Sequence, residues 1–215
     1  MKTLNSIYIY SAIILTFFVL GNTIAFGQES RRDNPSPYAL ELMRERQEKD
    51  MDFKTSDNSP IDAASRNKFN GLYYFDADTS WIISAKLTLF ENPDTIAMKT
   101  TTDRLPLYLV FGTVEFRIKD TLYRLTVYRN IDLMKKPGYE DYLFIPFRDY
   151  TSGEQSYGGG RYLDVYLTQT GRLTLDFNKA YNPWCVYSRR YSCPLTPDEN
   201  YLNVYVTAGE KNYDY

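Results

Sequence analysis

The chain has 215 residues, with 25 Lys and Arg, 27 Asp and Glu, no His, 2 Cys, 21 Tyr, 12 Phe and 2 Trp. A formal net charge of −2 gives no general attraction to nucleic acid or anionic lipid. Without histidine the chain lacks Ser-His-Asp and Cys-His nucleophile activation and His-ligated zinc, and two cysteines cannot form a four-thiolate site. The composition therefore predicts no metal site and no cofactor, and it fits one domain.

The amino-terminal segment is typical of an export signal. From Thr3 to Gln28 the chain is uncharged, Lys2 precedes this stretch, and Ile7 to Leu20 is almost entirely apolar. Ala25-Phe26-Gly27 fits the small-x-small rule for signal peptide cleavage. An uncleaved membrane anchor is the alternative, because an uncharged stretch of this length can span a bilayer.

We therefore expect residues 1–27 to be a cleaved signal peptide. Residues 28–36 are polar and contain proline, which predicts a flexible leader. The mature protein is expected to be periplasmic or extracellular, without stable membrane insertion after signal cleavage. Residues 37–215 are expected to form a single β domain.

Residues Pro37 to Phe53 are predicted to form an amphipathic helix. Ser36 can cap the first turn, and proline is favoured at the first helical position. Leu40, Met43, Gln47 and Met51, with Phe53 beyond them, form a thin apolar stripe at helical spacing. We expect this stripe to pack against the rest of the domain.

The remainder of the chain alternates with a period of two, which predicts β-strands. Tyr, Phe, Thr, Val and Ile dominate these segments, and Gly, Pro, Asn and Asp bound them. A hairpin is expected around Lys119-Asp120. The predicted strands are Phe69–Phe75, Trp81–Phe90, Thr95–Thr101, Leu105–Phe111, Val114–Ile118, Thr121–Arg129, Tyr142–Phe147, Tyr162–Leu167, Arg172–Phe177 and Tyr201–Ala208. Many short strands at close spacing predict an all-β, mainly antiparallel sandwich or barrel.

The run Gly158-Gly159-Gly160 interrupts the strand pattern. Glycine-rich loops that cradle phosphate open a helix, whereas this run leads through Arg161 into a predicted strand. A tight structural corner is the favoured interpretation, and a loop that presents Tyr157 and Arg161 to a ligand is the alternative.

Eight polar residues in two irregular segments are expected to converge on one surface, which is either a ligand site or a structural cluster. They are Tyr157, Arg161, Asp176, Asn178, Tyr181, Asn182, Glu199 and Asn200. Arg161 can satisfy a carboxylate in two bonds, and Asp176 or Glu199 could supply it. Asp149 and Asp164 are further carboxylates that could build a polar cluster with Arg161.

Cys185 and Cys193 enclose seven residues. In an exported chain two cysteines this close favour a disulfide. Inert free thiols and a reactive thiol, with a thiolate favoured by Arg189 and Arg190, are the alternatives.

Several segments follow one another in a specific order. They are Phe69-Asn70-Gly71-Leu72, Phe144-Ile145-Pro146-Phe147-Arg148-Asp149, Thr151-Ser152-Gly153, Tyr157-Gly158-Gly159-Gly160-Arg161-Tyr162-Leu163, Leu175-Asp176-Phe177-Asn178, Ala180-Tyr181-Asn182-Pro183, Cys185, Cys193-Pro194, Glu199-Asn200 and Ala208-Gly209-Glu210-Lys211. This order resembles the bacterial DUF1684 family, a domain of unknown function. The resemblance implies an exported bacterial protein of the short secreted Bacteroidetes type, and it brings no established reaction.

Two functions remain open from the sequence. The first is a binding or structural module of the cell envelope, whose tyrosines could contact a small molecule, a glycan or a peptide. The second is a carboxylate-dependent hydrolase acting on glycans, with Asp149, Asp176 and Glu199 as candidate carboxylates.

Overall fold

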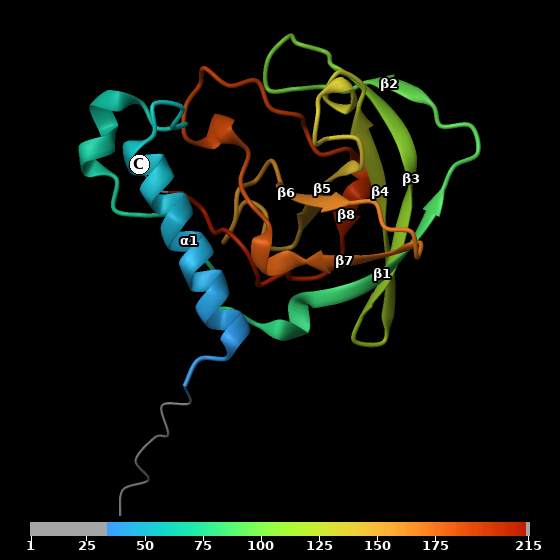
Figure 1. Cartoon of the computed structure of the whole chain (residues 1–215), viewed down its shortest axis with the longest axis horizontal. Coiled ribbons are helices and arrows are strands. Elements are labelled where there is room, and N and C mark those ends of the chain that lie inside the picture. The colour runs from blue at the N-terminus through green and yellow to red at the C-terminus, as the bar shows by residue number, and fades with distance from the viewer. Residues whose placement is uncertain (1–33, 214–215) are drawn as a thin grey trace, which may run out of the picture. The chain divides into compact units, whose positions relative to one another are not determined.

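A computed structural model describes residues 34–213 (Figure 1). The predicted signal peptide and nearly all of the leader lie outside the described residues. The α-helix is α1 (Pro37–Thr55), and the strands are β1 (Ile82–Leu89), β2 (Thr95–Ala97), β3 (Leu107–Ile118), β4 (Thr121–Asn130), β5 (Tyr142–Asp149), β6 (Arg161–Tyr166), β7 (Arg172–Asp176) and β8 (Tyr201–Leu202). Short 3-10 helices are η1 (Ala63–Lys68), η2 (Thr79–Trp81), η3 (Leu133–Lys135), η4 (Phe177–Lys179), η5 (Trp184–Val186) and η6 (Asp198–Asn200).

The predicted all-β fold with one helix is confirmed, and its form is a nearly closed antiparallel barrel. The strands follow the order β6-β5-β4-β3-β1-β7, with β2 paired to β3 and β8 paired in parallel to β5. The two end strands, β6 and β7, lie side by side without a hydrogen-bonded ladder. The barrel therefore has one seam, between β6 and β7.

Alternation along β5 and β6 sends apolar side chains into the barrel and aromatic ones outward. Leu143, Ile145 and Phe147 of β5 are fully buried in the main core, which Leu163 and Val165 of β6 also join. The intervening positions of both strands face the outside of the barrel, as the pleat of a strand requires. These outward positions provide the floor of the site described below.

The prediction of two separate strands, Leu105–Phe111 and Val114–Ile118, is wrong. The structure has one continuous strand, Leu107–Ile118, with a shift of register between Val110 and Gly112. A Cβ at Gly112 would collide with the carbonyl of Thr88 on β1, so glycine allows this bulge. The hairpin after β3 is confirmed, and Lys119 takes the positive φ of its turn.

Two other predicted strands are mostly absent. Residues 69–75 form only an isolated bridge at Tyr74, because Gly71 adopts φ +115° and the amide of Leu72 donates to the Asp50 carboxylate of α1. The strand predicted over residues 201–208 ends at Leu202. In both segments the hydrophobic side chains pack without a continuous strand ladder.

The orientation expected for α1 is wrong for most of the predicted stripe. Leu40, Met43 and Met51 of this stripe are 52%, 49% and 60% exposed. The buried apolar side chains of the helix are Leu42, which the predicted stripe omits, and Phe53, which stands at the end of that stripe. Among residues 34–213, no helix combines the length and the apolarity needed to cross a membrane.

Hydrogen bonds from polar side chains hold α1 against the segments that flank the barrel. The hydroxyl of Tyr38 donates to Asp176, and Arg46 donates to the carbonyls of Phe75 and Asn178. The pattern of apolar residues in the helix does not predict these contacts, because directed hydrogen bonds determine which face of α1 packs against the barrel.

Candidate functional site

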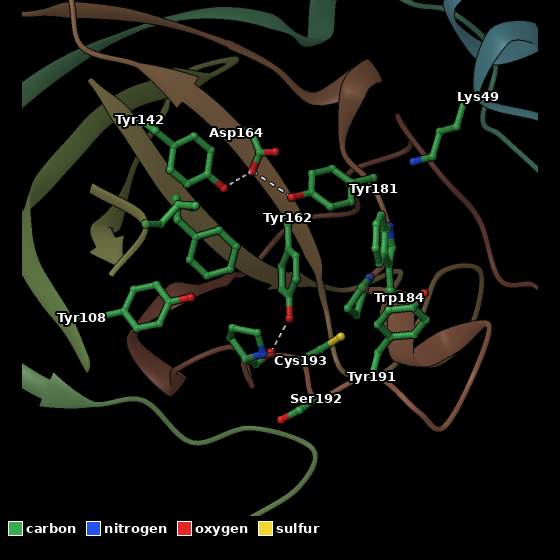
Figure 2. Close-up of a pocket in the computed structure, with 14 residues that line it drawn as sticks. Lys49, Tyr108, Tyr142, Tyr162, Asp164, Tyr181, Trp184, Tyr191, Ser192 and Cys193 are labelled. Carbon is green, nitrogen blue, oxygen red and sulfur yellow. Dashed lines mark hydrogen bonds between the residues drawn. The ribbon is translucent and has the colours of Figure 1, made fainter. Parts of the chain in front are cut away.

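A recess of about 550 Å³ lies on the outer face of β5 and β6 (Figure 2). Seven of its fourteen lining residues are aromatic, and we call it the aromatic pocket. Its residues are Lys49, Tyr108, Leu133, Tyr142, Phe144, Tyr162, Asp164, Tyr181, Pro183, Trp184, Tyr191, Ser192, Cys193 and Pro194. Its size and apolar lining are typical of small-molecule sites.

The register of β5 and β6 builds the floor of the pocket. Phe144 pairs with Asp164, and Pro146 pairs with Tyr162. Tyr142 is two residues before Phe144 and therefore shares its face. A shift of one residue in this pairing would exchange these side chains for the core set.

The segment 181–194 forms the opposite wall. Tyr181 and Tyr162 exchange two backbone hydrogen bonds of 2.9 and 3.1 Å, which join the start of the segment to β6. Near its end, the amide of Thr101 donates to the carbonyl of Cys193 at 2.9 Å, and Pro194 forms a bridge with Thr100. Both ends of this irregular wall are thus tied to β structure.

Asp164 is the only carboxylate among the fourteen lining residues. The hydroxyls of Tyr142 and Tyr181 both donate to its Oδ1, at 2.7 and 2.8 Å (Figure 2). Within the described part of the chain, no group donates to its Oδ2. The side chain is solvent-accessible, yet the surrounding rings partly desolvate it and raise the pKa of Asp164 above its usual value. The two tyrosine hydrogen bonds act in the opposite direction.

Rings pack edge to face along the floor. Tyr162 lies 4.7 Å from Phe144 and 5.7 Å from Tyr181 between ring centroids, at angles of 75° and 89°. Its hydroxyl donates to the carbonyl of Pro194, and burial raises its pKa well above the usual range. These contacts fix the rings before any ligand arrives.

Two further aromatic side chains, Trp184 and Tyr191, belong to the wall segment 181–194. Trp184 and Tyr191 contact each other edge to face at 5.1 Å, and Trp184 is 42% exposed. An exposed indole beside a recess can make large apolar contact with a ligand at low entropic cost.

Lys49 of α1 completes the rim of the pocket. Its Nζ lies 2.6 Å from Glu210 Oε1 and 5.1 Å from the centroid of the Tyr181 ring. Glu210 is buried, and its other oxygen accepts from the amide of Asn182 and the hydroxyl of Tyr187. One carboxylate therefore neutralises Lys49 and holds the wall segment.

The sequence from residue 67 to residue 211 matches the family model described as a protein of unknown function (DUF1684). The match spans well over half of the chain. The chain belongs to this family. All of the pocket residues except Lys49 lie within the matched range, so the family domain itself builds the pocket. No curated protein matches the chain.

A solved structure resembles this one over most of its length. The solution NMR structure of an uncharacterized protein from Haloarcula marismortui shares 38% sequence identity, with a TM-score of 0.62. The alignment covers 81% of the present chain and 94% of that chain. The two proteins therefore share the fold.

The eight residues predicted to converge occupy several different environments. Tyr181 is the only one of them that lines the aromatic pocket. Tyr157 lies beside the Cys185 thiol and packs against a second hydrophobic cluster. Glu199 accepts from the hydroxyl of Tyr128 at 2.7 Å.

Arg161 is buried with Asp149, one of the carboxylates expected to cluster with it, and not with the preferred partners Asp176 and Glu199. Its Nη2 lies 2.8 Å from Asp149 Oδ2, and both side chains are 0% exposed. Further donors reach the carbonyls of Val206, Ala208 and Glu210. This cluster ties the start of β6 to the carboxyl-terminal segment.

The three predicted asparagines all have structural partners. Asn178 bonds both the amide and the carbonyl of Asp78, and its amide donates to Asp176. Asn200 bonds Thr126 in the same two-sided way. Asn182 donates to the carbonyl of Lys211 and through its backbone to Glu210. Buried amides commonly anchor irregular segments in this manner.

Gly160 explains part of the glycine run. It adopts φ +96°, and a Cβ there would lie 2.6 Å from the carbonyl of Phe147 and 2.5 Å from Thr196 Oγ1. The run thus forms a tight corner at the start of β6.

The predicted disulfide is absent, and Cys185 and Cys193 are free thiols. The sulfur of Cys193 instead accepts a hydrogen bond from the Cys185 amide at 3.2 Å, where η5 starts. A hydrogen bond from the Cys193 thiol lowers the pKa of Cys185 to about 7. It raises the pKa of Cys193, which is buried.

Most pocket residues were not predicted as a site. Tyr108, Tyr142, Trp184 and Tyr191 read in sequence as ordinary strand or loop aromatics. Asp164 is a signal in the sequence that could have indicated the pocket. This carboxylate lies on the outward face of β6, where its neighbours on the same face are Tyr162 and Tyr166. Such a side chain is costly to desolvate unless a partner or a ligand compensates.

Proposed function

We propose that this protein is a ligand-binding module of the cell envelope and that the aromatic pocket receives its ligand. The observation that carries this proposal is a recess of about 550 Å³ that combines seven aromatic rings with one accessible carboxylate. A small molecule, or the end of a glycan or peptide, would bury its apolar surface against the rings.

A thermal shift screen tests the binding role. Organic cations, neutral sugars and short peptides are added in turn, because a ligand that binds the folded state raises the melting temperature. Leu133→Trp adds bulk at a pocket residue, and Leu122→Trp makes the same change at an exposed site outside it. A ligand that stabilises the wild type and Leu122→Trp, but not Leu133→Trp, supports the proposal. Failure of every class to stabilise the protein contradicts it.

The location in the envelope rests on residues 1–27, which carry the features of a signal peptide. We propose that the protein is exported and that it is a secreted family member of the Bacteroidetes type. Amino-terminal sequencing of protein recovered from the producing cell tests this proposal, with Gln28 expected as the first residue. Recovery from the cytoplasm with an intact amino terminus contradicts it.

Glycan hydrolysis is the second candidate. A recess of about 580 Å³ at the seam between β6 and β7 is lined by both Asp164 and Asp176, and paired carboxylates are what this reaction needs. Asp176, however, accepts from Tyr38 through both oxygens, while Asp149 is fully buried with Arg161. These bonds favour binding over hydrolysis. Release of reducing ends from glycans, lost in Asp164→Asn, would support the hydrolase instead.

A further inference from the structure

We infer that the aromatic pocket selects an organic cation, with an ammonium group held between Asp164 and the surrounding rings. This inference rests on the proposed binding function and adds the chemical class of the ligand. Three features of the pocket carry it.

The first feature is the unequal use of the two oxygens of Asp164. Oδ1 accepts from Tyr142 and Tyr181, while Oδ2 accepts from nothing in residues 34–213. The two tyrosines hold the carboxyl group in place, the Asp164 residue is exposed, and its second oxygen carries no hydrogen bond to the residues drawn in Figure 2. A positively charged group can therefore approach Oδ2 without breaking a hydrogen bond of the protein, and such charge-assisted contacts are the strong ones.

The second feature is that the three tyrosine hydroxyls on the floor of the pocket have no hydrogen left to donate to a ligand. The hydroxyls of Tyr142, Tyr162 and Tyr181 are already donated, to Asp164 and to the carbonyl of Pro194. Neutral sugars need several donors and acceptors to replace their water, and an anion would meet both the carboxylate and the negative ring faces. A cation suits this arrangement best.

The third feature is that one ring here already accepts an ammonium group. Lys49 Nζ lies 5.1 Å from the centroid of Tyr181, within the range of a cation–π contact. Lys49 forms its ion pair with Glu210, at 2.6 Å, and not with Asp164, so the Asp164 carboxylate stays open to a ligand.

Calorimetric titration with two molecules of the same shape tests the inference. The probes are choline and its neutral isostere 3,3-dimethylbutan-1-ol, with glucose as a neutral sugar, at pH 8. Choline is expected to bind at least about 10-fold more tightly than the isostere, from cation–π attraction and the charged contact. Asp164→Asn is expected to remove this preference. Asp198→Asn, which changes the same charge at a side chain 99% exposed and outside the pocket, is expected to retain it.

The other outcomes separate this inference from the binding proposal. Equal binding of choline and the isostere, tight binding of glucose, or unchanged choline affinity in Asp164→Asn overturns the cation assignment while a pocket ligand still stands. Absence of choline binding also overturns the cation assignment, and if the thermal shift screen yields no ligand of any class, the binding function fails as well.

Discussion

Replacement of Arg161 by methionine removes the central member of a fully buried polar cluster. The guanidinium lies 2.8 Å from the Asp149 carboxylate, with both side chains 0% exposed, and donates to the Val206 and Ala208 carbonyls. Methionine fills a similar length without a charge or a donor. Asp149 is then left as an uncompensated buried carboxylate, and the carbonyls lose their partner.

Loss of one partner from a buried ion pair costs about 3–5 kcal/mol, mostly because the remaining charge stays desolvated. For a chain of this size the melting temperature would fall by about 6–20 °C. Arg44→Met provides the matched control. Arg44 pairs with Glu48 on the exposed face of α1, where such pairs contribute about 0.5 kcal/mol or less.

Urea denaturation followed by circular dichroism measures both variants against the wild type. We expect Arg161→Met to lower the free energy of unfolding several-fold more than Arg44→Met. The double variant Arg161→Met with Asp149→Asn should recover part of the loss, since it removes the unpaired charge. Equal small losses in the two single variants would refute the argument that Arg161 is a structural clamp.

Two further predictions concern the thiols and the glycine corner. The rate of Cys185 alkylation should rise with pH around a midpoint of about 7. Cys193→Ala should move that midpoint toward the ordinary thiol pKa of about 8.5, because the stabilising hydrogen bond is lost. An unchanged midpoint, measured by mass spectrometry of the alkylated peptides, would contradict this cause. Gly160→Ala should lower the free energy of unfolding by at least about 1 kcal/mol more than Gly138→Ala does. Both positions have positive φ, but only Gly160 lacks room for a Cβ. Equal unfolding midpoints of the two variants in urea would show that crowding at the corner is unimportant.

The barrel could be predicted because its signal is local. The alternation of Leu143, Ile145 and Phe147 with outward residues identifies a strand whatever its partners are. Ser36 at the N-cap likewise locates the start of α1, where its Oγ accepts from the amide of Ala39. Such features depend on residues only a few positions apart.

The docking of α1 and the pocket could not be predicted in the same way. Tyr38 and Asp176 are 138 residues apart, and nothing near either residue indicates the other. The pocket depends on the register that places Asp164 opposite Phe144, and on a wall segment held by the buried Glu210. Each of these contacts is set by the finished fold.

The central claim is that the aromatic pocket is the ligand site. Nuclear Overhauser contacts between the methyl protons of bound choline and the aromatic protons of the protein test it most directly. Contacts to Trp184 and Tyr181 are expected, because both rings line the pocket. Contacts confined to Trp81 and Tyr205, which line a separate recess of about 510 Å³, would contradict the claim.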